Sequence, residues 1–164
     1  MPRPQFQRHF DAARAAGFLS LPHAGETTGP QTVWDALDLL GASRIGHGVS
    51  AAQDPELLAH LAERQIVLEV CPSSNLATGA VASLEEHPLP AFVAAGVPVT
   101  INSDDPPMFG TDLNTEYAVA ADLLGLDRVG VADLARAAVR ASYAPQDLAA
   151  QIESEIDEYL AGWS

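Results

Sequence analysis

The sequence predicts an α/β fold in which helices pack outside a parallel sheet of four strands. Four apolar runs each end in a polar group and a tight turn, and they cover residues 18–23, 45–47, 66–70 and 97–101. Helical patterns and short connections separate these runs, which is typical of parallel strands joined by crossover helices. The strand spacing suits the ~30 residues per unit of a (β/α)8 barrel. Four strands leave two interpretations, an open sheet or half of a barrel.

The helices are predicted from apolar residues at helical spacing and from residues that begin or end helices. Phe6 and Phe10 share one face of the first helix, which Gly17 ends. Asp54 is a candidate N-cap. The segment 73–79 is polar and is predicted to be a loop. The predicted helices cover residues 5–16, 31–40, 55–64, 87–95, 115–124, 132–142 and 145–160.

Composition narrows the classes of partner. The 164 residues carry a formal charge of −14, from 22 acidic against 8 basic side chains, which disfavours binding to nucleic acid. Because no apolar run approaches ~18 residues, a membrane span is not expected. The N-terminus lacks the apolar segment of a signal peptide, so a cytoplasmic location is the simplest expectation. Cys71 is the only cysteine, which excludes an internal disulfide and a cysteine-based zinc cluster.

Titratable residues follow the predicted strands. His23 and Glu26 lie three residues apart around a glycine that permits a sharp turn. A neutral histidine ring can bind a metal, and a nearby glutamate can move protons to and from water. The structural alternative is a turn that caps the next helix. His47 lies between two glycines at the next strand end, where its alternative role is a hydrogen bond to a backbone carbonyl.

Asp104 and Asp105 end the fourth apolar run. Two adjacent carboxylates repel each other, and their desolvation is costly unless a cation or hydrogen-bond donors compensate. The alternative is an N-cap or Asx turn before the following prolines. Taken together, the strand-end histidines and acids suit a divalent metal with a water nucleophile, and they indicate metal-assisted hydrolysis.

Other polar residues have structural interpretations. Glu69 interrupts an apolar strand, and it is predicted to point to the helix layer and to pair with an arginine. Cys71 is predicted to lie in the core. The segment 73–75 either lines a site or shapes a turn. A surface position is expected for three further histidines, His9, His60 and His87.

Four motifs, in this order, resemble the adenosine deaminase family. They are His-Ala-Gly-Glu at 23–26, Arg-Ile-Gly-His-Gly at 44–48, Glu-Val-Cys-Pro-Ser-Ser-Asn at 69–75 and Asn-Ser-Asp-Asp-Pro at 102–106. The resemblance implies a zinc hydrolase on a (β/α)8 barrel, with this chain as its C-terminal half, strands five to eight. Residues 1–164 would then be the C-terminal portion of one deaminase domain. The Pro-Cys-x-x-Cys signature of cytidine-type deaminases is missing.

The resemblance gives each strand-end group a role. His23 and Asp104 correspond to zinc ligands. Glu26 corresponds to the acid that protonates the purine ring at N1, and His47 to the group that orients the attacking hydroxide. Water would add at C6 and ammonia would leave. The positions that correspond to substrate-binding groups are Gly25, through its backbone N–H, and Asp105.

One feature of the family is missing from the sequence, because no His-x-His pair is present to supply further zinc ligands. We therefore expect the chain alone to be inactive and to bind zinc weakly. The expected substrate is adenosine or a related 6-aminopurine nucleoside, with aminodeoxyfutalosine and adenine as alternatives. A catalytically inactive half-barrel, its open edges covered by a second chain, is an alternative of another class. A third is an unrelated α/β domain that binds Mg²⁺.

Overall fold

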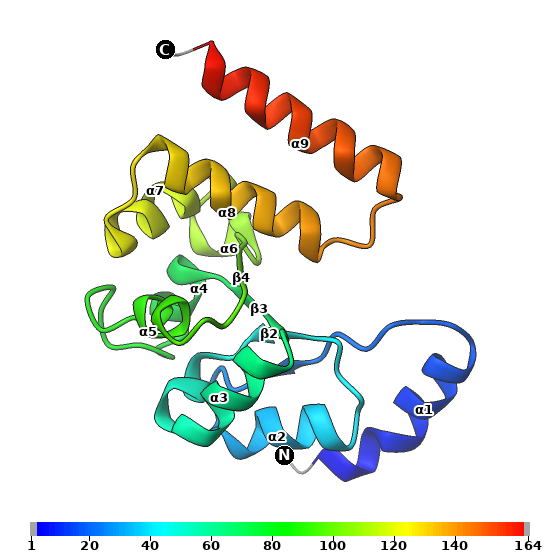
Figure 1. Cartoon of the computed structure of the whole chain (residues 1–164). Coiled ribbons are helices and arrows are strands. Elements are labelled where there is room, and N and C mark those ends of the chain that lie inside the picture. Colours follow the sequence, from blue (N-terminus) through cyan, green and yellow to red (C-terminus); the bar gives the residue numbers. More distant parts are fainter. Residues whose placement is uncertain (1–2, 163–164) are drawn as a thin grey trace.

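A computed structural model describes residues 3–162, and in it four parallel strands form one sheet in the order β1-β2-β3-β4 (Figure 1). The strands are β1 (His23–Ala24), β2 (Arg44–His47), β3 (Val67–Val70) and β4 (Val99–Ile101). His23 pairs in register with Gly46, and Gly46 pairs with Glu69. Because neighbouring strands run in the same direction, their carboxyl ends meet at one edge of the sheet. The predicted parallel α/β fold is confirmed.

Along the chain, helices lie before the first strand, between successive strands and after the last strand. Aspartate side chains cap four of them, since Asp54, Asp105, Asp112 and Asp127 each accept a backbone N–H of the first turn. The helices are η1 (Arg3–Phe6), α1 (Gln7–Ala15), α2 (Gln31–Asp38), η2 (Val49–Gln53), α3 (Pro55–Glu63), α4 (Pro72–Ala77), α5 (Leu89–Ala94), α6 (Pro106–Phe109), α7 (Leu113–Leu124), α8 (Arg128–Ala141) and α9 (Gln146–Ala161). Among the residues of this part of the chain, no helix is long and apolar enough to cross a membrane.

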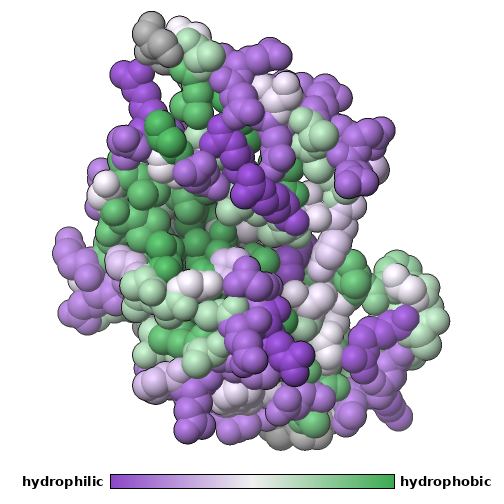
Figure 2. Space-filling model, in the orientation of Figure 1, coloured by the Kyte–Doolittle hydropathy of each residue, from purple (hydrophilic) through white to green (hydrophobic). Residues whose placement is uncertain are grey.

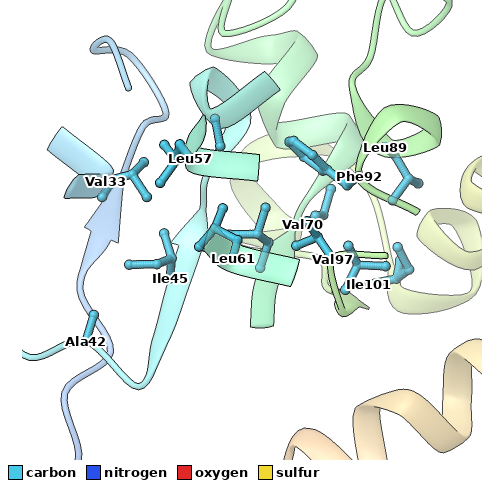
Figure 3. Close-up of a cluster of buried hydrophobic side chains, with 14 of the residues drawn as sticks. Val33, Ala42, Ile45, Leu57, Leu61, Val70, Leu89, Phe92, Val97 and Ile101 are labelled. Carbon is cyan, nitrogen blue, oxygen red and sulfur yellow. The ribbon is translucent and has the colours of Figure 1, made fainter. Parts of the chain in front are cut away.

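The main core lies between the sheet and the helices α2, α3 and α5 (Figure 3). Leu68 and Val70 of β3 are fully buried there, and they share the cluster with Leu61 of α3 and Phe92 of α5. Burial of a large apolar side chain contributes about 1.5–3 kcal/mol, so this layer fixes the orientation of the strands. It leaves alternate residues of β3, including Glu69, on the opposite face of the sheet.

An apolar groove of about 870 Å³ separates α9 from α8 and α7. Figure 2 shows hydrophobic residues gathered over α7 and α8, below α9. The lining includes Val131 and Ala135 of α8 and Ile152 and Ile156 of α9. None of the residues of α9 is buried. The apolar side of this helix is therefore only partly covered by α8.

The first strand is much shorter than predicted, because β1 contains only His23 and Ala24. Pro22 has no N–H to donate to a neighbouring strand, so regular pairing cannot extend through it. Phe18 and Leu19 are exposed. The carbonyl of Ser20 still accepts from the N–H of Ser43, so the segment lies beside β2 without forming a regular ladder.

The polar segment 73–79, predicted to be a loop, instead lies largely within α4 (Pro72–Ala77). Pro72 occupies the first turn, where a missing N–H costs nothing. The Ser73 N–H donates to a carboxylate oxygen of Glu116 at 3.1 Å. Glu116, the acceptor at the N-terminus of α4, belongs to α7. The local sequence around residues 73–79 therefore does not indicate this hydrogen bond.

Candidate active site

Two histidines meet at the carboxyl ends of neighbouring strands. The Nε2 atom of His47 lies 3.3 Å from Nδ1 of His23, and the two rings are nearly perpendicular, at 73°. Gly46 makes this contact possible, because a Cβ there would lie 2.7 Å from the His23 ring. His47 is buried and His23 is exposed. One ring is therefore held by the protein while the other faces the open side of the site.

Backbone conformations at the strand ends are unusual. His47 has φ +65° and Asp104 has φ +56°, in the left-handed region that non-glycine residues rarely adopt. Such conformations cost of order 1–3 kcal/mol and persist only where the surroundings impose them. Their presence at both His47 and Asp104 supports a functional role for these two positions.

The potential metal-ligating atoms form two overlapping groups. Atoms of His23, Glu26 and His47 lie within 4.8 Å of one another, and so do atoms of His47, Cys71 and Asp104. The Glu26 carboxylate is 3.7 Å from Nε2 of His47. Imidazole nitrogens and carboxylate oxygens are the donor types that zinc accepts. The residues present therefore fit part of a zinc coordination shell.

Asp104 is positioned by a neighbouring helix. The hydroxyl of Ser74, near the start of α4, donates to Oδ2 of Asp104 at 2.7 Å. Cys71 is buried beside it, as predicted, and burial raises the pKa of its thiol to about 12. At neutral pH the thiol is protonated, which disfavours it as a ligand. The carboxylate of Asp104 is therefore the stronger candidate in this group.

A cavity of about 440 Å³ opens between these groups. Its lining includes His23, His47 and Asp104, together with Glu69. The prediction that Glu69 points to the helix layer is wrong, because Leu68 and Val70 occupy that face. The predicted arginine partner is confirmed, since Nε of Arg44 lies 3.2 Å from the Glu69 carboxylate.

Behind His47 lies a polar pair, Asn75 and His87. Asn75 belongs to the segment 73–75, for which a place in a site was one of the two expected alternatives. Nδ2 of Asn75 is 3.1 Å from Nδ1 of His47, and Oδ1 of Asn75 is 3.2 Å from Nε2 of His87. The surface position expected for His87 is wrong, because only 3% of it is exposed. Burial lowers the pKa of His87 to about 4 and also lowers the pKa of His47, which Glu26 partly opposes.

The two positions predicted to bind substrate already have partners in the chain. Asp105 is exposed and accepts the Met108 N–H at 3.2 Å, so its carboxylate caps α6. The Gly25 N–H donates to Oγ1 of Thr32 at 3.0 Å. The structural alternative considered for the acid pair therefore holds for Asp105. It does not hold for Asp104, which faces the cavity.

Comparison with known proteins identifies the family of this chain. Residues 1–159 match the adenosine deaminase family. An aminodeoxyfutalosine deaminase of Streptomyces coelicolor is 69% identical over 161 residues, which are 98% of this chain and 42% of that protein. An adenine deaminase of Arthrobacter aurescens superposes with a TM-score of 0.92 at 34% identity, over 98% of this chain and 49% of that one.

A further solved relative carries metal. It is an amidohydrolase of Burkholderia ambifaria with bound zinc, with a TM-score of 0.82, 26% identity and coverage of 98% of this chain and 47% of that one. This chain thus spans less than half the length of the relatives it matches. Its four strands correspond to half of their barrel. The chain therefore belongs to the adenosine deaminase family, and it corresponds to the C-terminal portion of the proteins of that family.

Proposed function

We propose that this chain supplies the C-terminal part of the active site of a zinc-dependent aminohydrolase that releases ammonia from C6 of a 6-aminopurine nucleoside. The observation that carries the proposal is the convergence of His23, Glu26, His47 and Asp104 at one edge of the sheet. Barrel enzymes place their chemistry at this edge.

His23 and Asp104 are the proposed zinc ligands on this chain. They lie on the first and last strand ends, line the same cavity, and each approaches His47. Zinc, when bound, lowers the pKa of water and supplies a nucleophile at neutral pH. Two residues do not complete the ligand set of a zinc ion, and the sequence contains no His-x-His pair. Further ligands would therefore come from elsewhere in the whole protein.

Glu26 and His47 are the proposed proton-transfer and orienting groups. The carboxylate of Glu26 is partly exposed and lies 3.7 Å from Nε2 of His47, which is buried. Glu26 would deliver a proton to N1 of the purine as water adds at C6. The C6–N bond then breaks, the amine takes a proton and leaves as ammonia, and a carbonyl remains at C6. Nε2 of His47, which lies near His23 and Glu26, would orient the attacking oxygen.

Gly25 and Asp105 remain proposed substrate contacts. Each would have to change or share a partner, because Thr32 accepts from the Gly25 N–H and the Met108 N–H occupies one oxygen of Asp105. A purine presents both acceptors and donors at its ring edge, so a backbone N–H and a carboxylate are suitable partners.

Aminodeoxyfutalosine is the substrate that we favour. The support is the 69% identity to a protein named for this activity, against 34% to the adenine deaminase structure. Adenosine and adenine use the same chemistry at C6, so the groups described here do not discriminate among the three.

The test is a hybrid enzyme, in which the N-terminal portion of the Streptomyces coelicolor relative is joined to this chain. We expect it to bind zinc and to release ammonia with the highest kcat/KM on aminodeoxyfutalosine, against adenosine and adenine at equal concentrations. A folded, zinc-loaded hybrid that deaminates none of the three would overturn the proposal. Preference for adenosine would overturn only the choice of substrate.

A further inference from the structure

A buried chain of hydrogen bonds runs from a helix backbone to His47. The Leu89 N–H, at the start of α5, lies 3.1 Å from Nδ1 of His87. Nε2 of His87 lies 3.2 Å from Oδ1 of Asn75, and Nδ2 of Asn75 lies 3.1 Å from Nδ1 of His47. Asn75 is fully buried, and both histidines are at most 3% exposed. Water therefore has little access to replace any of these bonds.

The direction of every bond in this chain follows from its first member. A backbone N–H can only donate, so Nδ1 of His87 must accept and the His87 proton must lie on Nε2. That N–H needs an acceptor, which assigns the carbonyl oxygen of Asn75 to it. The Asn75 amide group then faces His47 and donates to its Nδ1 atom. Nδ1 of His47 is thus an acceptor, and its proton lies on Nε2.

We propose that His87 and Asn75 are positioning residues that fix the tautomer of His47, so that its Nε2–H points into the active site. This atom lies 3.3 Å from Nδ1 of His23 and 3.7 Å from the Glu26 carboxylate. The tautomer follows from geometry alone, whereas its role in deamination rests on the proposed function.

The opposite tautomer is costly in this setting. A proton on Nδ1 of His47 would face the Asn75 amide hydrogens, and two buried donors would oppose each other. The Asn75 amide could relieve this only by rotating by about 180°. Its N–H groups would then face the Nε2–H of His87, and two donors would again oppose each other. Burial also lowers the pKa of His87 to about 4, so this ring is neutral near pH 7 and keeps one donor and one acceptor.

The arrangement gives His47 a defined task. Its Nε2–H can donate to an oxygen that carries or develops negative charge, and its Nδ1 atom cannot take up a proton from the site. Proton transfer is then left to Glu26, whose carboxylate lies 3.7 Å from Nε2 of His47. A histidine held in the wrong tautomer by an altered partner is known to cost catalysis up to ~10⁴-fold in serine proteases.

The decisive measurement is nitrogen NMR of the 164-residue chain labelled with ¹⁵N at histidine, at about pH 8, where histidines are neutral. We expect Nδ1 of both His47 and His87 to have the shift of an unprotonated acceptor and Nε2 of both to carry hydrogen. A His47 signal with the proton on Nδ1 would overturn the proposal. This result does not depend on metal or on activity.

Asn75→Asp provides a second test, because a carboxylate accepts from both histidines. The proton of His47 should then move to Nδ1 while that of His87 stays on Nε2. Asn114→Asp makes the same change of charge at an exposed position of α7 and should leave both rings unchanged. An unaltered His47 in a folded Asn75→Asp variant would contradict the assignment.

The catalytic consequence is measured in the hybrid enzyme. Asn75→Asp should lower kcat by ~10²-fold or more with little change in KM and with zinc content retained, because it alters a group that acts through His47. A fall in zinc content instead would assign Asn75 a merely structural role. If the unsubstituted hybrid is inactive, the proposed function fails while the NMR result still decides the tautomer.

Discussion

Gly25 illustrates how a single residue without a side chain supports the site. Its φ is +67°, and a Cβ at this position would lie 2.6 Å from Val33 and 2.8 Å from the Ser50 hydroxyl. The turn between His23 and Glu26 therefore requires both the left-handed conformation and the space.

We expect Gly25→Ala to lower the free energy of unfolding by roughly 1–3 kcal/mol, measured by urea denaturation. Two controls separate the causes. Gly79 has φ +72° but open space, and Gly29 has open space without positive φ. Gly79→Ala should cost less than Gly25→Ala, and Gly29→Ala should cost least. Equal effects at all three positions would contradict the importance of the close contacts.

The sequence predicts the groups that end strands and misses those that lie behind them. His23, Glu26, His47 and Asp104 each follow an apolar run, so their convergence could be expected from the parallel sheet. Asn75 and His87 could not be predicted in the same way. Asn75 contacts His47 across 28 residues, and His87 contacts Asn75 across 12 residues. For His87, burial by the surrounding fold overrides the polarity of its own segment.

Helix α4 depends on a side chain from another helix. Glu116 of α7 is fully buried, accepts the Ser73 N–H and accepts the hydroxyl of Thr111. α4 in turn carries Ser74, which contacts Asp104, and Asn75, which contacts His47. The placement of α7 therefore helps to set the positions of Asp104 and His47 in the candidate active site.

We expect Glu116→Ala to reduce the free energy of unfolding by roughly 2–4 kcal/mol, because buried donors lose a charged acceptor and a cavity remains. Glu153→Ala is the matched control, since Glu153 pairs with the exposed Arg140 and should cost less than about 1 kcal/mol. Chemical denaturation of both variants decides the matter. A Glu116→Ala protein as stable as the control would show that α4 does not depend on this acceptor.

The burial of His87 makes stability depend on pH. The pKa of His87 is lowered from 6.5 to about 4. The unfolded chain therefore binds a proton between these values while the folded chain does not, so acid favours unfolding. Stability from this residue is complete above about pH 6.5 and falls by about 3 kcal/mol by pH 4. The carboxylates of the protein also make its stability depend on pH in the acid range.

We expect His87→Gln to remove this component. The difference in unfolding free energy between the unsubstituted chain and the variant should be constant above about pH 6.5 and should shrink as the pH falls toward 4. Urea denaturation at several pH values measures it, and the carboxylate contribution cancels in the difference. A difference that does not change between pH 7 and pH 4 would contradict the buried neutral state of His87.

At the scale of the whole molecule, the four described strands form an open sheet with α2, α3 and α5 on one face and the site at one edge. The order of strands and helices could be predicted, because hydrophobic periodicity is local. The short length of β1 could have been predicted as well, because Pro22 is visible in the sequence. The helix at 72–77 could not, since its partner Glu116 comes from α7.

The central claim is that one edge of this sheet holds a zinc ligand, Asp104, and a proton-transfer group, Glu26, each within 4.8 Å of His47. The most direct test is to measure zinc content and kcat together in the hybrid enzyme carrying Glu26→Gln or Asp104→Ala. Glu26→Gln keeps the shape and polarity of the side chain but cannot transfer a proton, so kcat should fall ~10²–10⁴-fold with zinc retained. Asp104→Ala should lose zinc first, and activity with it. A Glu26→Gln enzyme that loses zinc, beside an Asp104→Ala enzyme that keeps zinc and activity, would contradict the account.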